Sequence, residues 1–282
     1  MRLVGIIAAA LGLLLVAIVA GWKWHSARIE RQPDNPAVTA TDDAGADWRA
    51  EVVLEQLSEQ HPDYNVSRLT VVLRNSKGRE IETPDTQFEV NGVPLRYAVG
   101  QGNYYDRHPY YRLREDSCFG FAADTTYELT LRRAQGPASP FARIRTPAPM
   151  SPTSFRVPAA HPSNRDLVIA WTELRQPAEL LIYKTHTLID AQGNQAIEAG
   201  GPNAEDAIRQ RIGSGGLALR EGTYTIPVGY FATSAAGRVS ALGIEITATN
   251  SGQFLHPVLR QSSVTARRKI VLRIDVVASQ KP

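Results

Sequence analysis

A tyrosine-rich stretch in the middle of the chain carries the residue types best suited to holding a ligand. It runs Asn103-Tyr104-Tyr105-Asp106-Arg107-His108-Pro109-Tyr110-Tyr111-Arg112. Tyrosine offers a flat apolar ring and a hydroxyl, which suits a sugar ring or a protein hot spot. The alternative is that two strands flank a turn at His108-Pro109 and each buries one tyrosine, because consecutive strand residues point to opposite faces. The candidate ligand or partner surface comprises Tyr104, Tyr105, Asp106, Arg107, His108, Tyr110 and Tyr111.

Two residues of this stretch could also perform acid–base chemistry. Asp106 and His108 have the spacing of neighbours on one face of a strand. Catalysis also needs a nucleophile or a third orienting group, and the chain has no Gly-x-Ser-x-Gly elbow. An envelope hydrolase that uses these two residues is therefore an alternative hypothesis to binding.

No motif indicates a metal, cofactor or nucleotide site. The six histidines form no His-x-His or His-Glu-x-x-His pattern. Gly213-Ser-Gly-Gly216 follows a predicted helix instead of opening one, so it lacks the arrangement of a phosphate loop. Cys118 is the single cysteine, which leaves no partner for an intramolecular disulfide, and no neighbour marks it as an activated thiolate. We predict a non-enzymatic protein without catalytic, cofactor-binding or metal-binding residues.

The composition favours a folded, all-β protein. With 282 residues, 43% hydrophobic and 21% charged, the chain can bury the cores of two domains. Its 21 glycines and 18 prolines separate short apolar runs, as turns separate strands. The net charge is only +3, so we predict no nucleic-acid partner. The densest basic run, Arg267-Arg268-Lys269, leads into an apolar strand, and we interpret it as strand-edge or surface charge instead of a polyanion site.

The N-terminal segment has the length and composition of a membrane span. Residues 3–21 carry no charge, and at 1.5 Å per residue they approach the bilayer's hydrocarbon thickness of about 30 Å. Trp22, Lys23 and Trp24 follow, as in an interfacial belt. Ile18 would occupy the minus-three position of a cleavage site after Ala20, where a small residue is expected. We therefore favour an uncleaved anchor over residues 1–24, with a cleaved signal as the alternative.

The orientation of this anchor rests on two opposing arguments. Only Arg2 precedes the apolar segment, whereas Lys23, Arg28 and Arg31 follow it, which slightly favours a cytoplasmic body. The body, however, has the pattern of an envelope-type sandwich, which favours the outside by analogy. We expect a single-pass protein of the cytoplasmic membrane whose body lies in the periplasm. Residues 25–47, which contain few large apolar side chains, would form a polar tether.

The rest of the chain divides into two predicted β-sandwich domains, residues 48–146 and 154–282, joined by a proline-rich linker over 147–153. In the first domain, strands are expected at 68–73, 126–132 and 141–145, and Asn91-Gly92 predicts a tight hairpin turn. In the second, 166–171 and 179–183 are expected to pair as its first strands. Residues 203–212 predict a short helix capped by Asn203, and Gly243 predicts a β-bulge.

Two stretches resemble a known superfamily. Leu167-Val-Ile-Ala-Trp171, with Tyr183 after the next strand, is similar to the early strands of a fibronectin type III or immunoglobulin-like domain. Asp124-Thr-Thr-Tyr127-Glu-Leu-Thr-Leu131 resembles the tyrosine corner of the same superfamily. The resemblance implies an adhesion, scaffold or binding module and no particular ligand. Together with the anchor, it predicts a non-enzymatic envelope protein that binds a protein partner, with glycan binding through the tyrosine stretch as the alternative.

Overall fold

The computed structural model of the protein describes residues 38–39, 48–59, 65–82, 86–101, 107–112, 120–133, 137–189, 195–232, 238–256 and 261–277. The predicted anchor and nearly all of the predicted tether lie outside these residues. Within the part that is described, no helix is long and apolar enough to cross a bilayer. The described chain is almost entirely β-strand, which confirms the all-β prediction.

The first half of the body forms a sandwich with its own core. Its strands are β1 (Val38–Thr39), β2 (Arg49–Glu59), β3 (Asn65–Arg74), β4 (Ile81–Glu82), β5 (Thr86–Val90), β6 (Val93–Pro94), β7 (Arg96–Gln101), β8 (Arg107–Arg112), β9 (Thr126–Arg133) and β10 (Ser139–Arg145). Strands β2, β3, β8 and β7 lie side by side in that order. The facing sheet has the order β10-β9-β5-β6, and a short strand from later in the chain, Gln253–Phe254, pairs with the outer side of β10. This is the strand order of an immunoglobulin-like sandwich.

The second half forms another sandwich. Its elements are η1 (Pro152–Ser154), β11 (Phe155–Arg156), β12 (Ala160–Pro162), β13 (Leu167–Thr172), β14 (Ala178–Ile189), β15 (Gln195–Gly200), β16 (Ile208–Ile212), β17 (Glu221–Ile226), η2 (Val228–Phe231), β18 (Arg238–Ser251), β19 (Gln253–Phe254) and β20 (Ser263–Val277). Strands β11, β13 and β17 face a sheet that contains β14, β18 and β20. Trp171 is completely buried between the sheets, and its indole N–H donates to the carbonyl of Ala218 at 3.0 Å. Gly222 lies under the indole, where any larger side chain would overlap with it.

Strand β20 belongs to both sandwiches, and β18 runs beside it over most of its length. β18 and β20 have 14 and 15 residues, about 45 to 50 Å of extended chain, which exceeds the length of one sandwich. Beyond the second core, β20 runs parallel to β2, with register from Glu51 opposite Ser263 to Glu59 opposite Val271. Val264 and Ala266 of β20 complete the first core. One ten-stranded sheet therefore continues from β7 to β15 through both halves of the body.

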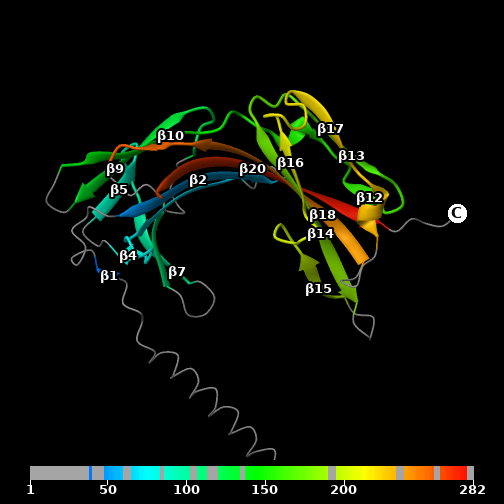
Figure 1. Ribbon diagram of the computed structural model, residues 1–282, viewed down its shortest axis with the longest axis horizontal. Helices are drawn as coiled ribbons and strands as arrows, with labels where there is room; N and C mark the ends of the chain where they lie inside the picture. Colours follow the sequence, from blue (N-terminus) through cyan, green and yellow to red (C-terminus); the bar gives the residue numbers. More distant parts are fainter. Residues whose placement is uncertain are drawn as a thin grey trace, which may run out of the picture.

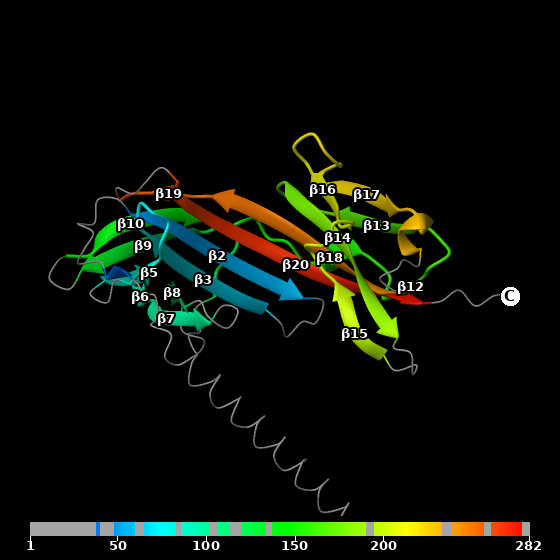
Figure 2. The same cartoon turned by 60° about the horizontal axis from the view of Figure 1, so that its bottom comes forward.

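The ten-stranded sheet forms an arch (Figure 1). Both smaller sheets lie on its convex side, one at each end, and β7 and β15 turn down at its two edges (Figures 1 and 2). The core residues of β20 explain this arrangement, because Val264, Ile270 and Ile274 have the same parity along the strand and therefore point to one side. In the described part of the chain, the concave side carries no second layer.

Several local predictions are confirmed. Strands are present at each expected position in the first half, and Asn91 and Gly92 adopt positive φ values of 47° and 81° between β5 and β6, as a type I′ hairpin turn requires. The tyrosine-corner stretch also has the expected contact, because the hydroxyl of Tyr127 accepts the backbone N–H of Ala122 at 2.7 Å.

The predicted helix over residues 203–212 is wrong. Its second half is strand β16, which pairs with β14, and turns occupy residues before it. Ile208 and Ile212 both face the second core. Two apolar residues four apart share one face of a helix and also one face of a strand, so this short segment fits both periods.

Three further expectations are corrected. Strands β13 and β14 do not pair but lie in opposite sheets, because the connection at residues 173–177 crosses from one sheet to the other. Gly243 pairs in regular register with Tyr183 and Arg273, so the predicted β-bulge is not there. The β18 strand is irregular at Ser240 instead, between the residues that pair with Thr185 and His186 of β14. β8 passes through His108-Pro109 as a strand, so no turn divides the tyrosine stretch there.

Because β20 contributes residues to both cores, we expect the body to unfold as one cooperative unit. Leu69→Ala in the first core and Ile169→Ala in the second remove fully buried side chains, and each should cost about 2–5 kcal/mol. Scanning calorimetry should show one transition whose midpoint both variants lower. Val168→Ala is the matched control, because Val168 is 49% exposed on the same strand as Ile169 and should leave the transition nearly unchanged. Two transitions, each lowered by one variant alone, would contradict the shared-strand argument.

Candidate functional site: the concave face of the long sheet

The structure places part of the predicted tyrosine surface and leaves part undescribed. Tyr104, Tyr105 and Asp106 lie outside the described residues. Arg107 and His108 begin β8, where their backbones pair with β7, and the positions of their side chains are not described. The proposed Asp106–His108 acid–base pair therefore stays a prediction.

Tyr110 and Tyr111 point to opposite sides of β8. Tyr111 is only 3% exposed and packs in the first core, with its ring 4.8 Å from that of Phe88 in an edge-to-face contact. Tyr110 is half-buried on the other side of the strand, where the guanidinium of Arg112 lies 6.0 Å from its ring centroid. Tyr111 is thus a core residue, and of these two only Tyr110 belongs to the concave side of the arch.

The concave side is rich in arginine. In β20, Arg267, Lys269 and Arg273 alternate with core residues and point to this side. The sequence analysis interpreted Arg267-Arg268-Lys269 as strand-edge or surface charge. The strand-edge alternative is corrected here, because β20 has β18 on one side and β2 on the other, whereas Arg267 is an exposed surface charge. The basic described side chains on the concave side from β7 to β18 are Arg49, Arg68, Arg74, Arg96, Arg112, Arg267, Lys269 and Arg273, and the acidic ones are Glu51, Glu55, Glu245 and Asp275.

Some of these charges already have partners. Arg74 bonds Glu51 at 3.0 Å and Glu80 at 3.3 Å, which balances the charge near β4. On β20, Lys269 bonds Glu245 at 3.0 Å, and both side chains are largely buried by their neighbours. Glu55 of β2 lies opposite Arg68 of β3 on one side and opposite Arg267 of β20 on the other. Both arginines are exposed. The middle of the face therefore has more exposed positive than negative charge.

Tyr183 closes the other end of this face. Its ring covers Gly243 on the neighbouring strand, and a methyl group there would overlap with the ring. Burial, followed by the charge of Glu245 and the hydrogen bond with it, raises the pKa of the Tyr183 hydroxyl. Tyr183 is therefore a neutral hydrogen-bonding group at physiological pH, without the character of a nucleophile.

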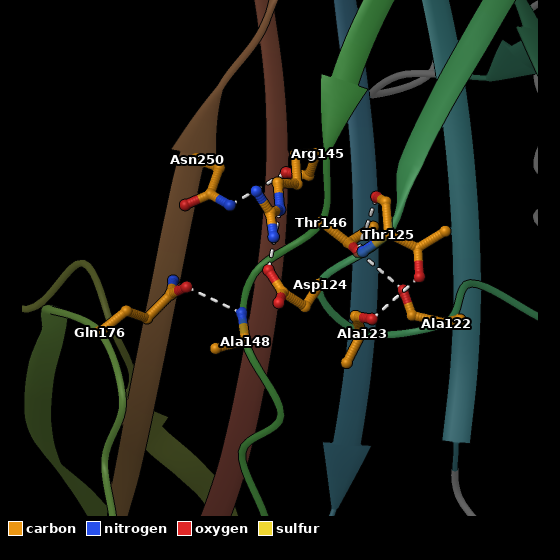
Figure 3. Close-up of polar contacts among 9 residues, drawn as sticks. All are labelled: Ala122, Ala123, Asp124, Thr125, Arg145, Thr146, Ala148, Gln176 and Asn250. Atoms are coloured by element: carbon orange, nitrogen blue, oxygen red, sulfur yellow. Dashed lines mark hydrogen bonds and ion pairs between the residues drawn. The ribbon is translucent and has the colours of Figure 1, made fainter.

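Several polar contacts link the two sandwiches at their junction (Figure 3). Arg145 lies at the end of β10, and its guanidinium donates to the carboxylate of Asp124 at 2.8 Å. The backbone carbonyl of Arg145 accepts a hydrogen bond from the side-chain amide of Asn250 on β18 at 3.0 Å. In the linker, the backbone N–H of Ala148 donates to the side-chain oxygen of Gln176 at 2.8 Å. The start of the predicted proline-rich linker is thus hydrogen-bonded to the second sandwich.

A half-buried arginine lies where the two cores meet. Arg268 points to the core side of β20, between Ala266 of the first core and Ile270 of the second. It donates to the side-chain oxygen of Gln56, whose amide in turn donates to the carbonyl of Phe121 at 3.0 Å. Burial lowers the pKa of Arg268. These polar contacts separate the two hydrophobic cores without interrupting the sheet.

A second polar cluster lies on the convex side, at the end of the second core. The ammonium of Lys184 is 2.8 Å from the carboxylate of Asp206 and 4.3 Å from the centroid of the Tyr230 ring. The hydroxyl of Tyr230 donates to the carbonyls of Ile182 and Asp206, and its pKa is raised by burial and by the Asp206 charge. These contacts hold the turn before β16 against η2. His186 is buried nearby, and its Nδ1 has no hydrogen-bond partner among the described residues.

The polar groups of the described residues form structural contacts and no candidate metal centre. The polar clusters contain ion pairs and neutral tyrosines, and no group of three or more described histidine, cysteine or acidic residues could hold a metal ion. The concave face is the feature best placed to meet a partner. The sequence signal that could have identified it is the alternation of Arg267, Lys269 and Arg273 with the apolar residues of one long strand.

Comparison with known proteins identifies no family. No protein-family model and no curated protein matches the chain. Among solved structures, the crystal structure of the FN1-FN3 domains of chicken CNTN1 aligns over 79% of this chain, with 11% identity and a TM-score of 0.20. The chain covers 64% of that structure, which is less than two thirds of its length. The all-β fold therefore rests on the strand arrangement itself.

The packing of the tyrosine stretch gives a direct test. Tyr111→Ala should cost about 3–5 kcal/mol of unfolding free energy, because it empties part of the first core. Tyr110→Ala, one residue away on the concave side, should cost far less and serves as the matched control. Urea unfolding followed by tryptophan fluorescence measures both. Equal costs for the two variants would contradict the assignment of opposite sides.

The Lys184–Asp206 pair predicts a pH-dependent contribution to stability. The hydrogen bond from Lys184 lowers the pKa of Asp206 below its usual value of 3.8. The pair therefore contributes fully above that value and is lost as the pH falls through the folded-state pKa. Because Asp206 is 49% exposed, Asp206→Asn should lower the unfolding free energy at pH 7 by less than about 1 kcal/mol.

Urea unfolding at a series of pH values should show this difference shrinking to zero in acid. Glu205→Gln, which neutralises the neighbouring exposed carboxylate, is the control. An Asp206→Asn effect that persisted unchanged after Asp206 had become protonated in the folded protein would show that the ion pair is not its cause.

Proposed function

We propose that this protein is a membrane-anchored, extracytoplasmic scaffold that binds a partner protein on the concave face of its long sheet and performs no catalysis. The observation that carries the proposal is the continuous sheet through both sandwiches. Two sandwiches on a flexible linker would present two independent surfaces. Here the β2–β20 ladder makes them one body with one broad open face.

The rigidity of the arch supports a scaffold role. The shared strand β20 and the junction hydrogen bonds of Asn250 and Gln176 connect the two sandwiches, which would hold the face together before any partner arrives. A preorganised surface loses little conformational entropy on binding, so more of the contact energy appears as affinity. A partner on the concave face would touch strands from both halves at once.

The tether supports placement near a membrane. Residues 3–21 have the composition of an anchor, and Val38 of β1 pairs with Ile81 of β4 in the first sandwich. Only residues 25–37 would then separate the anchor from this attachment. Fully extended, that stretch spans about 45 Å at most. The body would therefore remain close to the membrane surface, in the periplasm on the orientation that we favour.

Glycan binding is a second candidate, and one observation favours it. Tyr110 and Arg112 lie together on the concave side, and an aromatic ring beside a guanidinium can hold a sugar by stacking and hydrogen bonds. A polysaccharide panel separates this candidate from protein binding. Loss of glycan binding in Tyr110→Ala, a residue outside the core, would support it.

Topology is the first test of the anchored scaffold. Reporter fusions after residues 47 and 282, with protease digestion of intact spheroplasts, should show the body accessible from outside. Deleting residues 3–21 should release the body from the membrane fraction, because no other anchoring segment is proposed. Replacing Lys23 with Gln is the control, because it leaves the apolar length intact and should leave the protein membrane-bound.

The opposite topology would overturn the proposed location. A protease-protected body with a reporter active in the cytoplasm would show that the positive charges after the anchor determine its orientation. The protein would then be a membrane-tethered cytoplasmic factor.

A further inference from the structure

We infer that the partner of the concave face is an extended acidic polypeptide segment that lies along β20, with acidic side chains over the basic residues and small or apolar ones between them. This inference rests on the proposed function in one respect, the use of the concave face for binding. It adds the chemistry of the partner.

The first argument is the order of charges along the strand. Arg267, Lys269 and Arg273 point to one side at positions two and four residues apart. Same-side residues of a strand repeat every 6.5 to 7 Å or so. An extended peptide has the same repeat, so its alternate side chains can stay in step with these positions over several residues. Lys269 already bonds Glu245 at 3.0 Å, and Arg273 bonds Asp275 at 3.3 Å. Arg267 is therefore the cation of this strand that a partner carboxylate would contact first. A flat lipid surface cannot follow a concave face in this way.

The second argument is the chemistry between the charges. Val271 lies among the cations of β20, and Val53 and Leu57 occupy the same side of β2. All three are half-buried and leave apolar surface between charged groups. A polypeptide that alternates acidic and apolar side chains can match both features. An anionic polysaccharide matches the charges and offers less to the apolar positions.

The third argument is the balance of charge at the centre. Arg68 and Arg267 flank Glu55 from the two neighbouring strands, so one carboxylate lies opposite two exposed guanidiniums. The two arginines lie on β20 and β3 with β2 between them, and the single carboxylate of Glu55 balances only one of them, so a carboxylate delivered by a partner supplies the missing negative charge. Charge-assisted hydrogen bonds from arginine to carboxylate are short and can be bidentate, which gives such a contact direction as well as strength.

The experiment measures binding of labelled synthetic peptides to the full-length protein in detergent. The first peptide alternates glutamate with valine and serine, and the control peptide carries lysine in place of each glutamate. We expect fluorescence anisotropy to show saturable binding of the acidic peptide only. Raising the salt concentration should weaken it, because the Debye length falls to about 3 Å at 1 M.

The variant that tests the site is Arg68→Gln with Arg267→Gln. Both side chains are exposed, so folding should be retained, and we expect the dissociation constant to rise about tenfold or more. Arg156→Gln with Arg220→Gln makes the same charge change at exposed positions of β11 and the turn before β17, outside the concave face. It should leave binding unchanged, and thermal melting of both variants checks that they are folded.

Three results would overturn the inference. These are no binding of the acidic peptide, equal binding by both double variants, or stronger binding to anionic polysaccharide or anionic vesicles than to the peptide. None of them alters the topology of the protein. Conversely, a cytoplasmic body would refute the proposed location while leaving peptide binding intact, so the two failures can be told apart.

Discussion

The backbone hydrogen bonds between β20 and its two neighbours are the interactions on which the rest of the architecture depends. β20 pairs antiparallel with β18 over the second sandwich and parallel with β2 over the first. Without the parallel ladder, the C-terminal strand would end at its own domain, and the sandwiches would be joined by a short linker alone. With it, the first core is completed by Val264 and Ala266, residues from the far end of the chain. The fold of the first half therefore requires the last strand, and long-range pairing of this kind forms late and slowly.

This constraint also determines which surfaces remain available. A strand with neighbours on both sides has no free edge, so its basic residues cannot serve as edge protection. Its two sides differ because one is covered by both cores and the other is not. At the join, Arg268 on the covered side is held by Gln56, while its neighbours Arg267 and Lys269 face the concave side. Three consecutive basic residues thus divide into one structural contact and two surface positions.

The sequence predicts the local elements well, and the long-range connections poorly. The hairpin at Asn91-Gly92 and the tyrosine corner at Tyr127 are local patterns, in which nearby residues determine the geometry. The pairing of β20 with β2 joins segments about two hundred residues apart, and nothing within either strand specifies the other as its partner. The error at β16 has another origin, because Ile208 and Ile212 satisfy helical and strand periods equally.

The candidate site follows the same division between local and long-range information. Because neighbouring residues of a strand point to opposite faces, the sequence predicts that one of Tyr110 and Tyr111 enters the core and the other does not. Which tyrosine enters the core depends on Phe88, a residue of the opposite sheet that contacts Tyr111. The concave face depends on more distant information still, because Glu55, Arg68 and Arg267 come together only when β2 lies between β3 and β20. A binding surface assembled by strand order leaves no compact motif, and the absence of a recognisable motif in this chain is therefore what such a surface would produce.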